Sequence, residues 1–259
     1  MSIVVNTNIG SLNAQRSLAE SSRELSTCIV RPSSGNNSSC AADDAAGFAI
    51  AERMTAQVRG LNMATKNAND GLAMLATIEN ATNDVTDMLQ RIRELAVQAA
   101  NDTNGAQDRT YLQTEVDSLV AEINRVSTDT VYNDSVVLDG NLSGSLQVGT
   151  ASGQTIDFAI DSIDATTLGV DALDFTDATT AATALTAIDS AIETVAGNRA
   201  GYGALSNRLE YTVSNLMNVA EFTTAARSRI EDADFAAESA RLAKAQVLQQ
   251  TGTATLAQG

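Results

Sequence analysis

The sequence predicts a mainly α-helical protein, with long antiparallel, coiled-coil-like helices from both termini and a small β-hairpin region in the middle. Apolar residues recur at intervals of three and four along most of the chain, the 259 residues include a single Pro, and 3% of them are aromatic although 44% are hydrophobic. Because Pro, which breaks helices, occurs once, helices can run well beyond the usual length of about 11 residues. An apolar content made mostly of Ala, Leu, Val and Ile suits narrow seams between helices. We therefore expect an elongated molecule.

The first expected element is an amphipathic helix over residues 6–30. Its apolar positions follow helical intervals, with Ser and Arg between them. Pro32 disfavours a helical conformation at Arg31, and residues 33–39 have the Ser, Gly and Asn composition of a loop. The sequence therefore predicts that this helix ends before Pro32.

A much longer helix is expected to begin near Asp43. Apolar residues from Ile50 to Ala96 are separated by three, by four or by sums of these steps. The pattern predicts a helix of about 58 residues, roughly 87 Å long at 1.5 Å per residue. Asp43 and the adjacent Asp44 are explained by favourable contact with the dipole of this helix rather than as a catalytic pair.

A third helix should fold back on the long one. The Asn, Asp and Gly residues of 101–105 interrupt the helical pattern, and Asn104 with Gln107 predicts a capping box for the next helix. From Leu112 to Val126 the apolar residues keep a strict 4-3-4-3 spacing. This spacing predicts an antiparallel helical hairpin.

The pattern changes between residues 132 and 177. Short runs such as 145–148 and 155–160 are separated by Gly, Asn, Ser and Asp, which predicts a β-hairpin region. Helical periodicity resumes at Leu185 and continues toward Leu248, so the chain should end in a long amphipathic helix. Both termini should lie at one end and pack together, although their Ala-rich seams make this pairing marginal without neighbouring subunits.

Charge and composition exclude several functions. A net charge of -16 repels nucleic acid and anionic lipid, which leaves protein partners. The first 11 residues lack the basic and apolar regions of a signal peptide, and no run of about 18 apolar residues predicts a membrane span. The sequence contains no His, no Gly-rich phosphate loop and no cluster of metal ligands. We therefore expect neither enzymatic activity nor a cofactor.

Two cysteines, Cys28 and Cys40, lie close together in the sequence. Without a second pair or a His they do not predict a metal site. A disulfide between them and two free thiols both remain open, because spacing alone does not supply the geometry that a disulfide needs.

Six motifs resemble those of bacterial flagellins and occur in the order of that family. The motifs are 6–15 (NTNIGSLNAQ), 43–47 (DDAAG), 66–71 (KNANDG), 89–98 (LQRIRELAVQ), 226–235 (ARSRIEDADF) and 249–252 (QQTG). The matching halves of the chain extend over 1–135 and 180–258. A single tripeptide would be weak evidence, but this ordered set identifies the chain as a member of the flagellin family.

The resemblance implies a domain organisation. Residues 1–42 together with 236–259 would form a terminal helical domain that lines the filament core. Residues 43–235 would form a helical rod domain that includes the β-hairpin region at about 132–177. The large outer domains of longer flagellins would be absent. Members of the family normally continue past the position that matches Gln258 and end in a leucine-rich tip, whereas this sequence stops at Gly259.

The same resemblance implies a structural subunit that self-assembles into the extracellular flagellar filament for motility. Its partners would be other copies of itself, the flagellar export chaperone, and the cap and junction proteins. The nearest alternative is the hook–filament junction protein, and the match at 228–232 argues for the filament subunit. A free coiled-coil adhesin or secreted effector is a more distant class, and self-polymerisation would separate the filament subunit from these alternatives.

One segment departs from the family pattern. In residues 30–40 a Pro replaces the usual Leu at position 32, and Asn and Ser replace an Arg-Ile-Asn run. These changes remove charge and apolar anchoring at the junction between the two expected domains.

A candidate contact site lies near residue 90. Without the resemblance, these charged residues would be interpreted as the solvated face of a helix. The resemblance implies contacts between protofilaments and, in free monomers, binding by the vertebrate Toll-like receptor that senses flagellin. The expected contact residues are Gln90, Arg91, Glu94, Leu95 and Glu115. Arg91 would act as a multidentate donor and Leu95 as an apolar knob.

Overall fold

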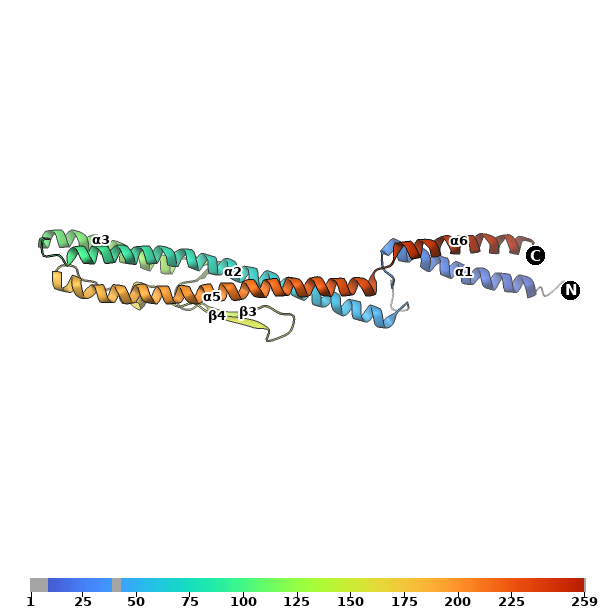
Figure 1. Cartoon of the computed structure of the whole chain (residues 1–259), viewed down its shortest axis with the longest axis horizontal. Helices are drawn as coiled ribbons and strands as arrows, with labels where there is room; N and C mark the ends of the chain where they lie inside the picture. The colour runs from blue at the N-terminus through green and yellow to red at the C-terminus, as the bar shows by residue number, and fades with distance from the viewer. Residues whose placement is uncertain (1–8, 39–42, 259) are drawn as a thin grey trace. The chain divides into compact units, whose positions relative to one another are not determined.

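The computed structural model describes residues 9–38 and 43–258 (Figure 1). It is mainly helical, with long antiparallel helices and small hairpins, which confirms the predicted fold class. The elements are α1 (Ile9–Ser34), α2 (Ala45–Ala99), α3 (Ala106–Asp129), β1 (Val131–Tyr132), β2 (Ser135–Val136), β3 (Ser143–Gln147), β4 (Thr155–Ala159), α4 (Ala165–Leu168), α5 (Ala178–Glu231) and α6 (Phe235–Gln258). The chain divides into two compact units, residues 1–59 with 219–259 (unit 1) and residues 60–218 (unit 2).

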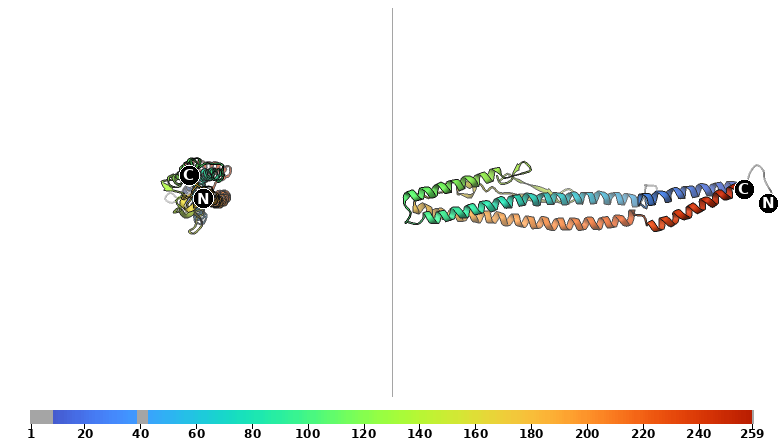
Figure 2. Two further views of the ribbon diagram at one scale, coloured as in Figure 1. Left: turned by 90° about the vertical axis from the view of Figure 1, so that its left-hand side faces the viewer. Right: turned by 90° about the horizontal axis from the view of Figure 1, so that it is seen from above.

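In unit 1, α1 and α6 form an antiparallel pair (Figures 1 and 2). The partly or fully buried positions of both helices follow steps of three and four, as the amphipathic pattern predicts. They include Ser11, Ala14, Leu18, Ser21, Leu25, Cys28, Arg31 and Pro32 in α1, and Glu238, Leu242, Ala245, Gln249 and Gly252 in α6. A Cβ atom at Gly252 would lie 3.3 Å from Leu18 Cδ1, so the absence of a side chain allows close approach there.

The prediction that α1 ends before Pro32 is wrong, because α1 continues to Ser34. Pro32 is half-buried in the seam with α6, and packing there outweighs its local preference. The helix ends one residue later than Ser34, at Gly35, where φ is +76° and the N–H donates to the Arg31 carbonyl at 2.9 Å. This left-handed conformation suits glycine and is a common helix end.

The predicted continuous carboxy-terminal helix is also interrupted. Between α5 and α6 the backbone pairs with the segment that follows α1: the Asn37 N–H donates to the Glu231 carbonyl at 2.7 Å, and the Ala233 N–H to the Gly35 carbonyl at 2.9 Å. Asp234 then caps α6 by accepting a hydrogen bond from the Ala236 N–H at 3.0 Å. The apolar spacing continues across this break, so periodicity could not show it.

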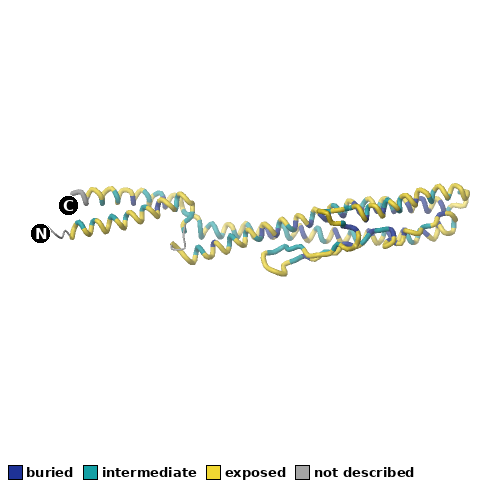
Figure 3. The backbone as a smooth tube through the Cα atoms, turned by 180° about the vertical axis from the view of Figure 1, so that it is seen from behind, coloured by how far each residue is buried: buried dark blue, intermediate teal, exposed yellow. Residues whose placement is uncertain are grey.

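In unit 2, α2 and α5 run antiparallel and α3 packs beside them (Figure 2). Along these helices, the residues coloured as buried recur between exposed ones (Figure 3). The core includes Ile78, Val85, Leu89 and Ile92 of α2, Val116 and Ile123 of α3, and Ile188, Val195 and Leu209 of α5. These residues belong to the seams that the sequence predicts.

The turn between α2 and α3 differs from the predicted capping box of Asn104 and Gln107. The helix α3 begins one residue later, after Gly105, whose N–H donates to the Asp108 carboxylate at 3.0 Å. The Asn104 side chain instead donates to the Gln98 carbonyl at 2.6 Å. Asn104 therefore covers the end of the preceding helix, and Asp108 takes the acidic position of the cap.

The segment after α3 contains two antiparallel hairpins, β1–β2 and β3–β4, which confirms the predicted β-hairpin region. In the second hairpin Leu146 pairs with Ile156, which is buried. The Asn67 side chain of α2 donates to the Gln147 carbonyl at 3.0 Å. A Cβ atom at Gly71 would lie 2.5 Å from Leu146 Cδ1, so glycine lets the hairpin lie close against α2.

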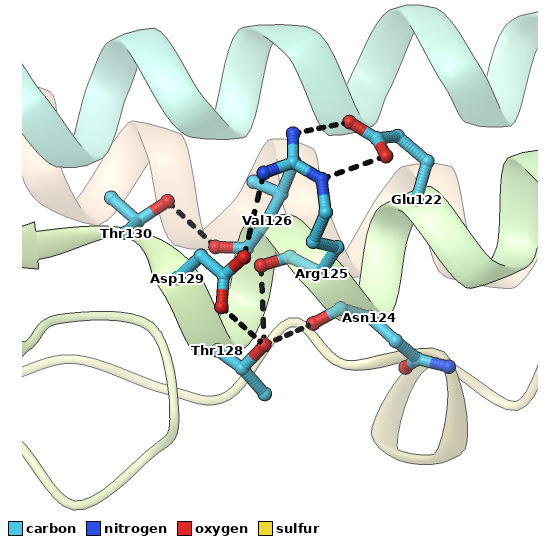
Figure 4. A network of polar contacts seen from close by, with 7 residues as sticks. All are labelled: Glu122, Asn124, Arg125, Val126, Thr128, Asp129 and Thr130. Carbon is cyan, nitrogen blue, oxygen red and sulfur yellow. Dashed lines mark hydrogen bonds and ion pairs between the residues drawn. The ribbon is translucent and has the colours of Figure 1, made fainter.

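The exposed carboxyl end of α3 carries a polar network (Figure 4). Arg125 donates to Glu122 at 2.9 Å and lies 3.5 Å from Asp129. The hydrogen bond from Arg125 lowers the pKa of Glu122. Because these charges are exposed, their pairing contributes little to stability.

Candidate interaction site

The candidate site is centred on Arg91, which links α2 to α3. Its Nε donates to Glu115 Oε1 of α3 at 3.0 Å, and its Nη1 donates to Glu94 Oε2 of α2 at 2.9 Å. Gln90, which precedes it on α2, is exposed. The structure therefore brings together four of the five predicted contact residues on one exposed part of the helical hairpin.

The hydrogen bonds to Glu94 and Glu115 raise the pKa of Arg91. All three side chains remain partly open to solvent. The pairs are therefore worth little as stabilising interactions, but they hold the guanidinium in one orientation between two carboxylates. This arrangement presents a fixed pattern of charge to a binding partner.

The predicted role of Leu95 as a projecting apolar knob is wrong for this structure, in which Leu95 is 1% exposed and belongs to the core of unit 2. It lies three residues after Ile92 and next to Ala96, so it falls on the apolar side of α2. Leu95 therefore supports the backbone beneath the polar cluster instead of protruding from it.

Tyr111, which the motifs in the sequence do not indicate as a contact residue, is 66% exposed. It lies four residues before Glu115 on α3, which places both on the same side of that helix. Its position in the sequence, outside the apolar seam that contains Leu112 and Val116, already indicates that Tyr111 is exposed. An exposed aromatic beside charged groups is typical of binding hot spots.

Arg93 lies on a different side of α2 from Arg91. Its Nε donates to Asp189 Oδ1 of α5 at 2.6 Å, and this hydrogen bond raises the pKa of Arg93. The neighbouring basic residues thus have separate roles, since Arg91 pairs with α3 and Arg93 with α5.

Of the two cysteines, Cys28 is buried in unit 1. Its pKa is raised by burial and by the nearby carboxylate of Glu238. Cys40 lies outside the described residues, so its pairing with Cys28 stays a prediction.

Within residues 9–38 and 43–258, no group of three or more His, Cys, Asp or Glu side chains is arranged to hold a metal ion. No helix in that part of the chain is long and apolar enough to cross a lipid bilayer.

Comparison with known proteins agrees with the motif order. Residues 5–143 match the bacterial flagellin N-terminal helical region, and residues 185–259 match the C-terminal helical region. The chain is 39% identical to a flagellin of Halalkalibacterium halodurans over 259 residues, which cover 99% of this chain and 95% of that protein. It is 37% identical to the flagellar filament 33 kDa core protein of Treponema phagedenis, with 99% and 96% of the two chains covered.

A solved structure agrees with these matches. The crystal structure of Bacillus cereus flagellin is 32% identical and aligns with a TM-score of 0.53, covering 58% of this chain and 88% of that one. Both family regions and a relative of nearly equal length therefore point to the same assignment. The chain belongs to the bacterial flagellin family, the non-enzymatic structural subunits that polymerise into the extracellular flagellar filament.

Proposed function

We propose that the terminal helices drive polymerisation, with residues 1–42 and 236–259 forming the inner core of the filament and residues 43–235 lying outside it. The observation that carries this proposal is the exposed apolar surface of α1 and α6 in the single subunit. Its members are Ile9, Leu12, Ile29, Val30, Phe235, Val247 and Leu248. Exposed apolar groups on both helices of a pair favour burial against further chains.

Electron microscopy of the purified protein after seeding tests this assembly. We expect long filaments of uniform diameter from the parent chain. Val247→Asp should abolish elongation, because it places a charge on the apolar surface, whereas Gln246→Asp, at an exposed polar neighbour, should still elongate. Filaments of normal length from Val247→Asp would contradict the role assigned to α6. Persistent parent monomers would instead favour a junction protein that caps without repeating.

The same experiment with and without reductant addresses Cys28 and Cys40. A disulfide between them would restrain the segment that follows α1, so reductant would change the extent of polymerisation. Filaments that are identical under both conditions would favour two free thiols.

A second proposed function is recognition of the free monomer by the vertebrate Toll-like receptor that senses flagellin. The supporting observation is the Arg91–Glu115 link, which fixes one charged surface across two helices. Gln90 and Glu94 would complete this contact, with Leu95 as its buried support. In the filament the same residues would contact neighbouring protofilaments. The export chaperone, cap and junction proteins are the further partners that the family assignment supports.

A cell-based receptor assay with purified monomers tests recognition. Arg91→Ala should reduce signalling by about tenfold or more, the effect expected when a charged hot-spot residue is removed. Arg93→Ala is the matched control, because it removes an exposed Arg of the same helix that pairs with α5 instead. Equal signalling by the parent and Arg91→Ala would refute this role. Circular dichroism should show unchanged helix content in both variants.

A further inference from the structure

The seam between α1 and α6 is poor in large apolar side chains. Leu18, Leu25 and Leu242 are its leucines among the described side chains. Its other members are small or polar: Ser11, Ala14, Ser21, Cys28, Arg31, Pro32, Glu238, Ser239, Ala245, Gln249 and Gly252. Because hydrophobic stabilisation grows with the apolar area buried, this pair gains little from its seam.

A charged side chain is buried in the same seam. Glu238, 4% exposed, lies in the first turn of α6. Its Oε1 accepts a hydrogen bond from Arg241 of α6 at 2.8 Å and lies 3.6 Å from Arg31 Nη1 of α1. Its Oε2 is buried without a hydrogen-bond partner, and so is Nε of Arg31. The ion pair that joins the two helices is therefore incompletely hydrogen-bonded.

Removing charged groups from water costs free energy, which is recovered only when the geometry is good and the remaining donors and acceptors are satisfied. Among the described residues, five buried side-chain atoms lack a hydrogen-bond partner, and three of them lie on α1 or α6: Ser21 Oγ, Arg31 Nε and Glu238 Oε2. The unrecovered cost of burying polar groups is thus concentrated in a helix pair whose seam is poor in large apolar side chains.

We propose that the Arg31–Glu238 pair is a built-in destabilising element, which keeps α1 and α6 weakly paired in the free subunit so that these helices become stable only in the filament. This inference rests on the proposed assembly through the terminal helices. An apolar pair of similar size at these positions would remove the desolvation cost and strengthen the seam. Removing Arg31 alone would leave the buried Glu238 carboxylate with fewer opposite charges nearby, and this would weaken the seam.

Cys28 can report the equilibrium between the paired and the separated states of α1 and α6. Cys28 is buried in the seam, one helical turn before Arg31, so a thiol reagent reaches it when the helices separate. In a Cys40→Ser background, the rate of Cys28 alkylation by iodoacetamide in free monomers measures this opening. Each rate is divided by the alkylation rate of the same variant unfolded in urea, which gives the reactivity of the exposed thiol.

Arg31→Leu/Glu238→Leu should be alkylated about tenfold more slowly than its parent, equivalent to about 1.4 kcal/mol of added pairing free energy. Arg31→Leu alone should be alkylated faster. Amide hydrogen exchange of α1 and α6 should slow in the double variant, while exchange in unit 2 stays unchanged and shows that the protein is folded. Arg31→Met/Glu238→Met provides a second apolar pair if the leucine variant misfolds.

Arg93→Leu/Asp189→Leu is the matched control, since it replaces an exposed ion pair between α2 and α5, and it should leave the Cys28 rate unchanged. Alkylation of both apolar double variants at or above the parent rate would overturn the inference. The monomer measurement is independent of polymerisation. Failure of the parent chain to grow on seeds would refute the assembly proposal and leave the alkylation result to be judged separately.

Discussion

Buried polar side chains show how strongly single residues depend on their surroundings in this chain. Three buried polar or charged side chains occur among the described residues: Thr82, Ser127 and Glu238. Thr82 donates to the carbonyl of Ile78, one turn earlier in its own helix, at 2.9 Å. Ser127 of α3 instead donates at 2.9 Å to the carbonyl of Leu138, which follows β2. Ser127 thus fixes the start of the segment that leads to the hairpin, whereas Glu238 is left partly unsatisfied.

Ser127→Ala should destabilise unit 2 by about 1–2 kcal/mol, because the Leu138 carbonyl would stay buried without its donor. Urea unfolding followed by circular dichroism measures the change. Ser118→Ala on the same helix is the control, since Ser118 is exposed and donates within its own helix to Thr114. Its effect should stay within about 0.5 kcal/mol. Equal losses in the two variants would show that the Leu138 contact contributes nothing.

At the scale of elements, the segment between α3 and α5 is held by aspartates that accept hydrogen bonds from nearby backbone and side-chain groups. The Asp164 carboxylate caps α4 by accepting from the Thr167 N–H at 3.2 Å, and Asp177 accepts from the Thr179 N–H at 2.7 Å just before α5. Hydrogen bonds lower the pKa of four such carboxylates: Asp139, Asp164, Asp174 and Asp177. The charged form of each is therefore favoured in the folded state.

This segment should lose stability in acid. A carboxyl group whose pKa is lower in the folded than in the unfolded state stabilises the fold above the ordinary value of 3.8, and this contribution disappears as the pH falls through the lowered value. Amide exchange of residues 139–177, corrected for intrinsic rates between about pH 6 and pH 2, should show loss of protection below the ordinary pKa. Asp164→Asn/Asp177→Asn should flatten this dependence, and an unchanged profile would argue against the capping role.

At the scale of the whole molecule, charge opposes assembly. Each subunit carries a net charge of -16, and polymerisation brings many such subunits together. Exposed charges separated by more than the screening length interact weakly, and this length falls from about 30 Å at 0.01 M salt to about 8 Å at 0.15 M. Association of the subunits must therefore overcome a repulsion that depends on ionic strength.

Raising sodium chloride from about 10 mM to about 150 mM should lower the critical concentration for seeded growth, because screening weakens the repulsion between subunits. Sedimentation of seeded reactions over a range of protein concentrations measures it. Potassium chloride at the same ionic strength should act equally, since the effect comes from screening and not from one cation. A critical concentration that is constant or rises with salt would show that repulsion does not limit assembly.

Local patterns in the sequence were sufficient to predict the mainly helical class, the long α2, the fold-back of α3, the hairpin region and the flagellin family. These features depend on the spacing of apolar residues and on turn residues, which act over a few positions along the chain. The clustering of Gln90, Arg91, Glu94 and Glu115 was expected from the family motifs, and the antiparallel helices bring these residues together.

Only the tertiary structure decided the features that depend on contacts between distant residues. Packing against α6 carries α1 through Pro32, and backbone pairing with residues 35–37 separates α5 from α6. Leu95 is buried as part of the core that the elements of unit 2 form together, and Glu238 is buried in a seam where it lies opposite Arg31. Periodicity identifies which side of a helix is apolar, but the burial of each residue is set by what the other helices place against it.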